Sequence, residues 1–366
     1  MKSTKRQRGS LLSLRPFSSF LSLSSFLTFA LERLTLRLRR SALYNPNLLC
    51  CNKPQSVDVE QSHKNMGNLR LNGIMPPLTT PFTVDGSLDL GALRANVSRY
   101  NQTGLAGYVA LGSNGEAVHL SSRERGQVIE TIKLSATDGH TIVAGVNELS
   151  TRAAIEATAA AANSGAEAAL VITPYFYKAS MTAGALSRFY TDVADQSPIP
   201  VLIYNVPQNT GVVIDSATVA ALAEHQNIAG VKDSSGNMGA ISDTIRRAPA
   251  SFAVMTGNGG ILYPSLAMGA RGAVLAVACA APKACVDLFQ AVQSGDHTLA
   301  RDLQSRLAPL SHAVTAGFGV AGLKAAMEMT GLAGGEPRAP LTRVSEADSQ
   351  KIRTVLRETG LFPDLE

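Results

Sequence analysis

From Asn72 towards the C-terminus, short apolar runs alternate with longer stretches in which apolar residues recur every three or four positions. Uninterrupted apolar runs are typical of parallel strands that are covered on both faces, and the spacing of three to four predicts amphipathic helices. The pattern predicts eight strands, at Gly73–Leu78, Gly107–Leu111, Thr141–Ala144, Ala168–Ile172, Pro200–Tyr204, Ile228–Val231, Phe252–Thr256 and Ala273–Ala276. It predicts the intervening helices near residues 89–103, 121–137, 150–165, 182–195, 216–225, 237–247 and 260–269.

This alternation places the protein in the α/β class. Eight strand–helix units within about 210 residues favour a TIM (β/α)8 barrel, whose typical size is about 250 residues. The alternative is a doubly wound open sheet, which usually carries a turn such as GxGxxG after the first strand, and no such turn follows here. Residues 281–360 predict further helices, so we place the barrel catalytic domain at 69–295 and a C-terminal helical appendage at 296–366.

The composition agrees with this fold class. Hydrophobic residues make up 45% of the chain, but aromatic residues only 5%, and Trp is absent. The core must therefore rest on Ala, Val, Leu and Ile, which let helices pack closely on a parallel sheet. The four cysteines form no CxxC pair and no Cys/His cluster with metal-ligand spacing, so we interpret them as buried or idle thiols of a reducing compartment.

The positive net charge of +5 belongs to the N-terminal segment. Residues 1–65 carry eleven Lys and Arg against three acidic residues, whereas the rest of the chain carries 22 basic and 25 acidic residues. The mildly acidic charge of residues 66–366 argues against a nucleic-acid partner.

The N-terminal segment itself predicts a targeting sequence. Residues 1–31 contain no acidic residue, and Leu31, Leu34 and Leu38 lie at helical spacing with arginines on another face. Arg-rich, Ser-rich and acid-poor segments are typical of mitochondrial presequences. We therefore predict a presequence at 1–43, a disordered linker at 44–68 and localisation in the mitochondrion.

Three other interpretations of this segment stay open. The run Phe17–Leu31 resembles the apolar core of a secretory signal, although its serines and the lack of a small-residue cleavage pattern weaken that alternative. A transmembrane span is disfavoured because the run falls short of about 20 apolar residues. Translation from Met66 would leave the segment without a role.

The candidate chemistry lies where the predicted strands end, since TIM-barrel active sites are built at the C-terminal ends of the strands. No His lies at these ends and no metal-binding constellation is evident, which disfavours a zinc-dependent aldolase. Thr256–Gly260 could hold a phosphate, but no Lys or Arg stands beside it. Polar and glycine residues follow five of the strands, at Gly112–Glu116, Thr173–Tyr177, Tyr204–Pro207, Lys232–Gly236 and Thr256–Gly260.

Lys232 is the most informative of these residues. It directly follows a strand predicted to be buried, and removal from water disfavours the charged ammonium and favours the nucleophilic amine. Tyr204 ends the neighbouring strand, where its phenol could shuttle a proton in aldol chemistry. The alternatives are a surface lysine paired with Asp233 and a tyrosine that caps the core.

Two glycine-containing turns are further candidates. Ser113 and Asn114, together with the backbone N–H groups of the turn, could hold a carboxylate. Gly257 permits close backbone approach to a ligand. For both segments a simple glycine turn is the alternative.

Four motifs stand at the ends of predicted strands, namely Gly112–Glu116, Thr173–Tyr175, Tyr204–Pro207 and Gly230–Ser234. In their order and spacing they resemble the dihydrodipicolinate synthase/N-acetylneuraminate lyase superfamily. The likeness extends from about Asn72 to Phe362. Within the superfamily, this chain is most similar to the mitochondrial 4-hydroxy-2-oxoglutarate aldolases at Ser113-Asn114, Ser197–Val201 and Arg338–Leu341.

The resemblance implies a Schiff-base lyase without metal or organic cofactor, assembled as a homotetramer. Lys232 would form the Schiff base with a 2-oxo acid, and Tyr204 would transfer the proton during C–C cleavage. Ser113 and Asn114 would bind the substrate carboxylate, and Ser234 and Gly257 would contribute contacts. The subgroup implies cleavage of 4-hydroxy-2-oxoglutarate to pyruvate and glyoxylate.

Two residues depart from the pattern of the superfamily. Dihydrodipicolinate synthases carry an arginine where this chain has Asn209, and the loss of a bidentate carboxylate clamp argues against that activity. Many members have a tyrosine of the proton relay where this chain has Phe176, and Tyr175 or Tyr177 would have to replace it. The open alternatives are a lyase for a 2-keto-3-deoxy sugar acid, a dihydrodipicolinate synthase-like enzyme, and a catalytically silent 2-oxo-acid binding protein.

Overall fold

The computed structural model describes residues 69–365, so the predicted presequence and linker lie outside the described residues. All eight predicted strands are present, and they form one parallel sheet in the order β1-β8-β7-β6-β5-β4-β3-β2. The strands are β1 (Gly73–Met75), β2 (Gly107–Ala110), β3 (Thr141–Val146), β4 (Ala168–Ile172), β5 (Val201–Asn205), β6 (Ile228–Asp233), β7 (Ala253–Thr256) and β8 (Gly272–Val274).

The two strands at the ends of this order, β1 and β2, meet and close the barrel. The Ala106 N–H donates to the Ile74 carbonyl at 2.9 Å, and the Val109 N–H donates to the Pro76 carbonyl at 3.1 Å. The Leu78 N–H in turn donates to the Val109 carbonyl at 2.9 Å. The prediction of a TIM barrel is therefore confirmed.

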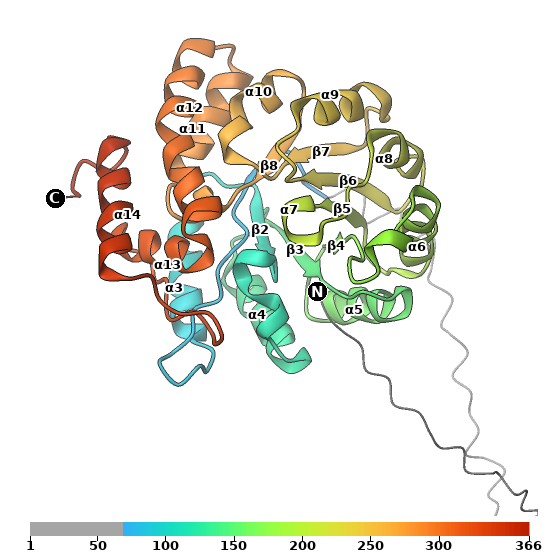
Figure 1. The fold of residues 1–366 in the computed structure, drawn as a ribbon, viewed down its shortest axis with the longest axis horizontal. Helices are drawn as coiled ribbons and strands as arrows, with labels where there is room; N and C mark the ends of the chain where they lie inside the picture. The colour runs from blue at the N-terminus through green and yellow to red at the C-terminus, as the bar shows by residue number, and fades with distance from the viewer. Residues whose placement is uncertain (1–68, 366) are drawn as a thin grey trace, which may run out of the picture. The chain divides into compact units, whose positions relative to one another are not determined.

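The predicted helices between the strands are also present and surround the barrel (Figure 1). Ser121 and Glu124 form a capping box at the start of the helix that follows β2. Most helices are a few residues shorter than predicted, because their last turns give way to the loops that lead into the strands. The helices are α3 (Leu90–Tyr100), α4 (Ser122–Ser135), α5 (Thr151–Asn163), α6 (Ala183–Gln196), α8 (Ser216–Leu222), α9 (Met238–Arg247) and α10 (Leu262–Ala267), with the short α7 (Pro207–Thr210) after β5.

Four further helices follow β8. The first, α11 (Pro282–Gln293), packs against α12 (His297–His312), and α13 (Gly319–Met329) packs against α14 (Glu346–Glu358). Figure 1 shows α12, α13 and α14 outside the strands on the side of α3. These are the predicted C-terminal helices, whereas the domain boundary at residue 295 stays a prediction.

The strands bury one set of side chains inside the barrel and the other set under the helices. Along β5, Leu202 and Tyr204 belong to the interior cluster, and Val201 and Ile203 belong to the cluster between strands and helices. This alternation follows from the two-residue period of a strand. It fixes which side chains can reach a site inside the barrel.

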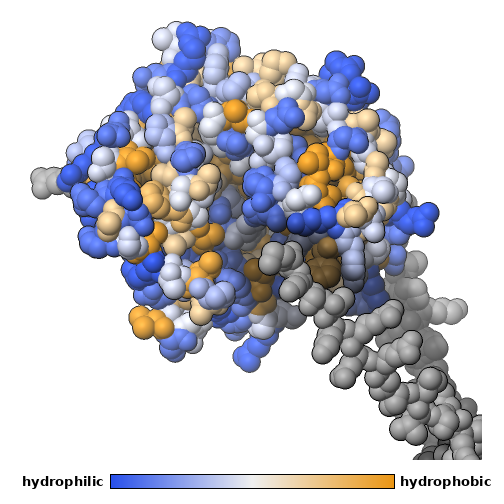
Figure 2. Space-filling view, in the orientation of Figure 1, coloured by the Kyte–Doolittle hydropathy of each residue, from blue (hydrophilic) through white to orange (hydrophobic). Residues whose placement is uncertain are grey.

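The described surface is mixed in character. Figure 2 shows hydrophilic residues interspersed with small hydrophobic patches on the face in view. None of the helices within residues 69–365 is both long enough and apolar enough to cross a membrane.

Candidate active site

Lys232 lies inside β6, one residue before its end, and not after the strand as predicted. Its neighbour Val231 packs under the helices, so by alternation the Lys232 side chain points into the barrel. The side chain is only 4% exposed. The strand extends past Val231 because Lys232 and Asp233 continue the parallel pairing with β5 and β7.

The alternative of a surface lysine paired with Asp233 is wrong. Asp233 points to the opposite side of the strand, where its carboxylate accepts a hydrogen bond from Asn205 Nδ2 at 2.7 Å and one from the Ser235 N–H at 2.8 Å. No carboxylate within residues 69–365 forms an ion pair with Lys232. The Lys232 amine is therefore buried, and among residues 69–365 its neighbours include no carboxylate at ion-pair distance.

The group beside the amine is the ring of Tyr204. Tyr204 is the direct register partner of Lys232 across β5 and β6, and the Lys232 Nζ lies 4.2 Å from the centre of the ring. The Tyr204 hydroxyl lies 3.4 Å from the Ser113 Oγ. Two adjacent strands, β5 and β6, and the turn after β2 thus bring the amine, the phenol and the Ser113 hydroxyl together.

The electrostatics of Tyr204 favour proton transfer. Burial by itself would raise the pKa of the Tyr204 hydroxyl, but the Lys232 ammonium and hydrogen bonds with Ser113, Lys232 and Ser234 outweigh it. The net result is a pKa below the ordinary value of a tyrosine. A phenol with a lowered pKa is better suited to give up and take back a proton near neutral pH.

Gly257, at the end of β7, is required by the packing of this site. A Cβ at this position would lie 2.9 Å from the Ser234 Cβ and 3.0 Å from the Lys232 Cε, closer than side chains normally approach. The absence of a Cβ at Gly257 therefore leaves room for the side chains of Ser234 and Lys232. Contacts of Gly257 and Ser234 with a ligand stay predictions.

Ser113 and Asn114 lie on a short 3-10 turn, Ser113–Gly115, after β2. Both residues are half-buried, and Asn209 Nδ2 donates to the Ser113 Oγ at 3.5 Å from the α7 turn. The turn therefore stands at the C-terminal ends of the strands, next to the Tyr204 hydroxyl. Binding of a carboxylate by Ser113 and Asn114 stays a prediction.

Phe176 and Tyr177 lie outside the barrel interior. Each is 72% exposed, and their rings stack edge to face at 5.1 Å. Val118, in the segment after the Ser113–Gly115 turn, is 65% exposed. Of the candidates for the missing tyrosine, Tyr175 packs partly against the interior cluster, and Tyr177 faces outward.

A second buried lysine, to which none of the sequence motifs pointed, lies next to the site. Lys324 of α13 is 2% exposed and pairs with Glu116, which directly follows the Ser113–Gly115 turn, at 2.6 Å. In the sequence, Lys324 is the single charged residue of the apolar segment Gly319–Met327, and this is the signal by which it could be found. Arg338 joins the same cluster, since its backbone N–H donates to Glu116 at 2.8 Å.

Cys279 and Cys285 are both buried, and burial raises the pKa of each thiol well above its ordinary value. Within residues 69–365 there is no group of three His, Cys, Asp or Glu side chains that could hold a metal ion.

Comparison with known proteins gives one consistent result. Residues 70–359 match the model of the dihydrodipicolinate synthetase family. The chain is 40% identical over 285 residues to the 4-hydroxy-tetrahydrodipicolinate synthase of Methanothrix thermoacetophila, an alignment that covers 78% of this chain and 95% of that protein. It is 35% identical over 290 residues to the enzyme of the same name from Neisseria gonorrhoeae, covering 79% and 99%.

Solved structures agree with the sequence comparison. The dihydrodipicolinate synthase of Acinetobacter baumannii, determined in complex with pyruvate, superposes with a TM-score of 0.76 at 33% identity and covers 80% of this chain and 100% of its own. A prophage protein of the dihydrodipicolinic acid synthase family from E. coli K12, also in complex with pyruvate, superposes with a TM-score of 0.75 at 28% identity, with the same coverage.

Proposed function

The chain belongs to the dihydrodipicolinate synthetase family and is a Schiff-base lyase of that family, and from this premise we propose that it cleaves 4-hydroxy-2-oxoglutarate to pyruvate and glyoxylate. The observation that carries the chemistry is the register pair Tyr204–Lys232 inside the barrel, with the amine 4.2 Å from the ring centre. The similar structures that contain pyruvate support a 2-oxo acid as the ligand.

The reaction begins at Lys232. Its neutral amine attacks the C2 carbonyl carbon of the substrate, the Tyr204 phenol gives its proton to the leaving hydroxyl, and loss of water leaves a protonated Schiff base and the Tyr204 phenolate. Tyr204 then takes the proton of the C4 hydroxyl, directly or through the Ser113 hydroxyl 3.4 Å away. The C3–C4 bond breaks, its electron pair moves into the Schiff base to form an enamine, and glyoxylate leaves as the aldehyde product.

The remaining steps restore the enzyme. The Tyr204 phenol returns its proton to C3 of the enamine, which regenerates a Schiff base that now carries pyruvate. Attack of water on C2 releases pyruvate and frees the Lys232 amine. Ser113 and Asn114 are in place to hold the carboxylate next to C2 throughout, because their turn lies beside the Tyr204 hydroxyl.

The choice of substrate rests on Asn209. Its amide donates to the Ser113 Oγ at 3.5 Å and carries no charge, whereas an arginine there would offer a bidentate clamp for a second carboxylate. The names of the relatives favour a second candidate, the synthesis of 4-hydroxy-tetrahydrodipicolinate from pyruvate. A lyase for a 2-keto-3-deoxy sugar acid is a third, served by the same amine and phenol.

Borohydride reduction in the presence of pyruvate tests the shared chemistry. We expect one covalent adduct, located by peptide mass spectrometry on Lys232, and none in the Lys232→Arg variant, because a guanidinium does not form the imine. Absence of an adduct would refute every Schiff-base candidate. An adduct without cleavage of any hydroxy-oxo acid would favour a 2-oxo-acid binding protein.

A side-by-side assay tests the substrate. We expect glyoxylate release from 4-hydroxy-2-oxoglutarate to exceed both aldehyde release from 2-keto-3-deoxy sugar acids and the formation of 4-hydroxy-tetrahydrodipicolinate. A higher kcat/KM for either of the other reactions would overturn this assignment.

We also propose that the enzyme acts in the mitochondrion as a homotetramer. The exposed Phe176–Tyr177 pair would give such an assembly an aromatic contact, because aromatic residues are enriched at protein interfaces. Import of a reporter fused to residues 1–43 tests the location, and sedimentation equilibrium tests the assembly. A cytosolic reporter or a monomer at working concentration would overturn the respective proposal.

A further inference from the structure

The turn that carries Ser113 and Asn114 is enclosed by two residues in an unfavourable backbone conformation. Leu111, two residues before Ser113, has a φ of 56°, and Glu116, which directly follows the turn, has a φ of 52°. Non-glycine residues rarely adopt this left-handed region, and they keep it only where surrounding contacts hold them. The contacts of Glu116 therefore decide whether the turn keeps its shape.

The Glu116 carboxylate is held from the C-terminal part of the chain. Its Oε1 lies 2.6 Å from the Lys324 Nζ, and its Oε2 accepts a hydrogen bond from the Arg338 N–H at 2.8 Å. The side chains of the Glu116–Lys324 pair are only 1% and 2% exposed. Loss of either partner would leave a charge buried without its counter-ion.

The Lys324 ammonium reaches the turn by a second route. It donates to the Thr80 carbonyl at 2.9 Å, and the Thr80 hydroxyl donates to the Gly115 carbonyl at 2.7 Å. A second hydrogen bond goes from the ammonium to the Glu336 carbonyl at 2.6 Å. Together with the ion pair to Glu116, the ammonium thus contacts three groups, and two of them, Glu116 and Thr80, adjoin the C-terminal end of the turn.

We propose that Lys324 is a positioning residue for the reaction, which keeps the Ser113–Gly115 turn in the shape that receives the substrate carboxylate. It does so through Glu116 and Thr80 without touching the substrate itself. The proposal rests on the proposed function in one respect, namely that Ser113 and Asn114 bind the 2-oxo acid.

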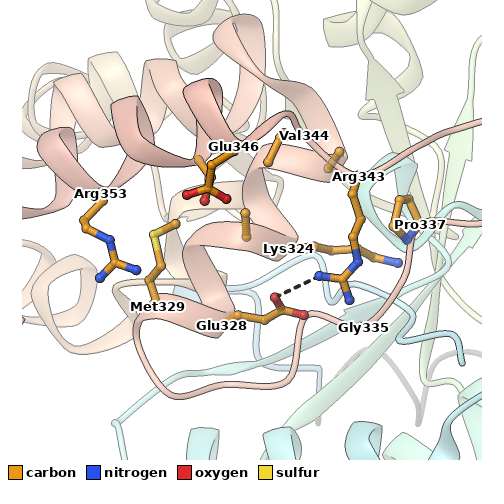
Figure 3. Close-up of a pocket in the computed structure, with 12 residues that line it drawn as sticks. Lys324, Glu328, Met329, Gly335, Pro337, Arg343, Val344, Glu346 and Arg353 are labelled. Atoms are coloured by element: carbon orange, nitrogen blue, oxygen red, sulfur yellow. Dashed lines mark hydrogen bonds and ion pairs between the residues drawn. The ribbon is translucent and has the colours of Figure 1, made fainter. Parts of the chain in front are cut away.

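Lys324 also lines a cavity, while its ammonium pairs with Glu116. Figure 3 shows this cavity between α13 and α14, with Lys324 on its wall together with Glu328 and Arg343, which are joined by an ion pair. The volume of the cavity is about 380 Å³. Because the lysine side chain runs from the cavity wall to Glu116, we expect that its removal would let a small alkylammonium ion take its place.

The first experiment compares wild type with the double variant Lys324→Met/Glu116→Gln, which removes both buried charges at nearly constant volume. Such replacements often preserve folding, and thermal unfolding checks this. The measured quantity is the pyruvate concentration that gives half-maximal borohydride trapping at Lys232. We expect it to rise at least ten-fold, while trapping at saturating pyruvate stays complete because the amine and Tyr204 are untouched.

A matched control is Lys283→Met, which removes an exposed lysine that is also paired with a carboxylate, Asp287 at 2.7 Å. We expect this variant to behave as wild type. A folded double variant whose half-maximal concentration equals that of wild type would overturn the proposal. Absence of trapping in wild type would instead refute the proposed Schiff-base chemistry, and with it the positioning role of Lys324.

The second experiment uses chemical rescue of the Lys324→Ala variant. It tests the positioning role of Lys324 even if the double variant does not fold. Ethylammonium added to the folded variant should enter through the cavity, pair with Glu116 and lower the half-maximal pyruvate concentration at least three-fold. The bulkier tetraethylammonium, which has no N–H to donate, should not. Equal effects of both ions, or no effect of either, would overturn the proposal.

Discussion

A single methyl group added at Gly257 should disturb the Schiff-base lysine more than the barrel. The backbone of Gly257 does not lie in the left-handed region, so Gly257→Ala is conformationally allowed and its effect is steric. The new Cβ would lie 2.9 Å from the Ser234 Cβ and 3.0 Å from the Lys232 Cε. Both distances are several tenths of an ångström below ordinary contact, so the two side chains must move.

The size of the effect follows from these contacts. Overpacking of a buried site costs about 1–3 kcal/mol, which corresponds to a decrease in Tm of several degrees for a domain of this size. A displacement of the Lys232 amine approaching 1 Å from its place beside Tyr204 should lower the reaction rate on the order of 100-fold. The loss of rate should thus exceed what the loss of stability explains.

The assay measures the rate of borohydride trapping with pyruvate, kcat/KM for glyoxylate release, and Tm. Gly184→Ala on α6 is the matched control, because a Cβ there meets nothing within 4 Å. We expect this control to be neutral or slightly stabilising, by about 0.4–1 kcal/mol. If the Gly257→Ala variant is trapped by borohydride at the same rate as wild type, the steric effect on Lys232 is refuted.

Three further predictions concern single side chains. Tyr204→Phe should retain the pyruvate adduct but lower kcat about 10²–10⁴-fold, since it removes the proton carrier; a wild-type kcat would exclude the phenol from the relay. Asn209→Arg should raise the ratio of 4-hydroxy-tetrahydrodipicolinate synthesis to glyoxylate release, and an unchanged ratio would show that this position does not select the substrate. Hydrogen bonds from Arg338 lower the pKa of Glu124 to about 2, so this pair contributes stability above pH 4.5 that is lost as the pH falls toward 2; urea unfolding across that range should show a smaller decrease for Glu124→Gln than for wild type.

The fold could be predicted because its signals are local. Each apolar run marks a strand that is buried on both faces, and each helical stretch carries its own period and caps, as at Ser121 and Glu124. Their number and alternation leave few topologies besides a barrel. The ends of strands were less certain, and β6 includes Lys232 and Asp233 because pairing with β5 and β7 extends it.

The central part of the candidate site could also be predicted. Lys232 and Tyr204 both stand near the ends of strands, and the rule that barrel sites form at these ends brings them to the same rim. What the sequence left open was whether Lys232 paired with Asp233. Strand alternation and the hydrogen bonds of Asp233 with Asn205 answer that question.

The sequence alone thus determined the barrel, the lysine and its neighbouring phenol, because strand period and strand order are properties of short segments. Only the tertiary structure decided that Tyr204 and Lys232 are register partners, that Gly257 leaves the space for the lysine stem, and that Glu116 is held by Lys324. These are contacts between segments far apart along the chain. They depend on how the barrel closes and where α13 packs against it, which no local pattern encodes.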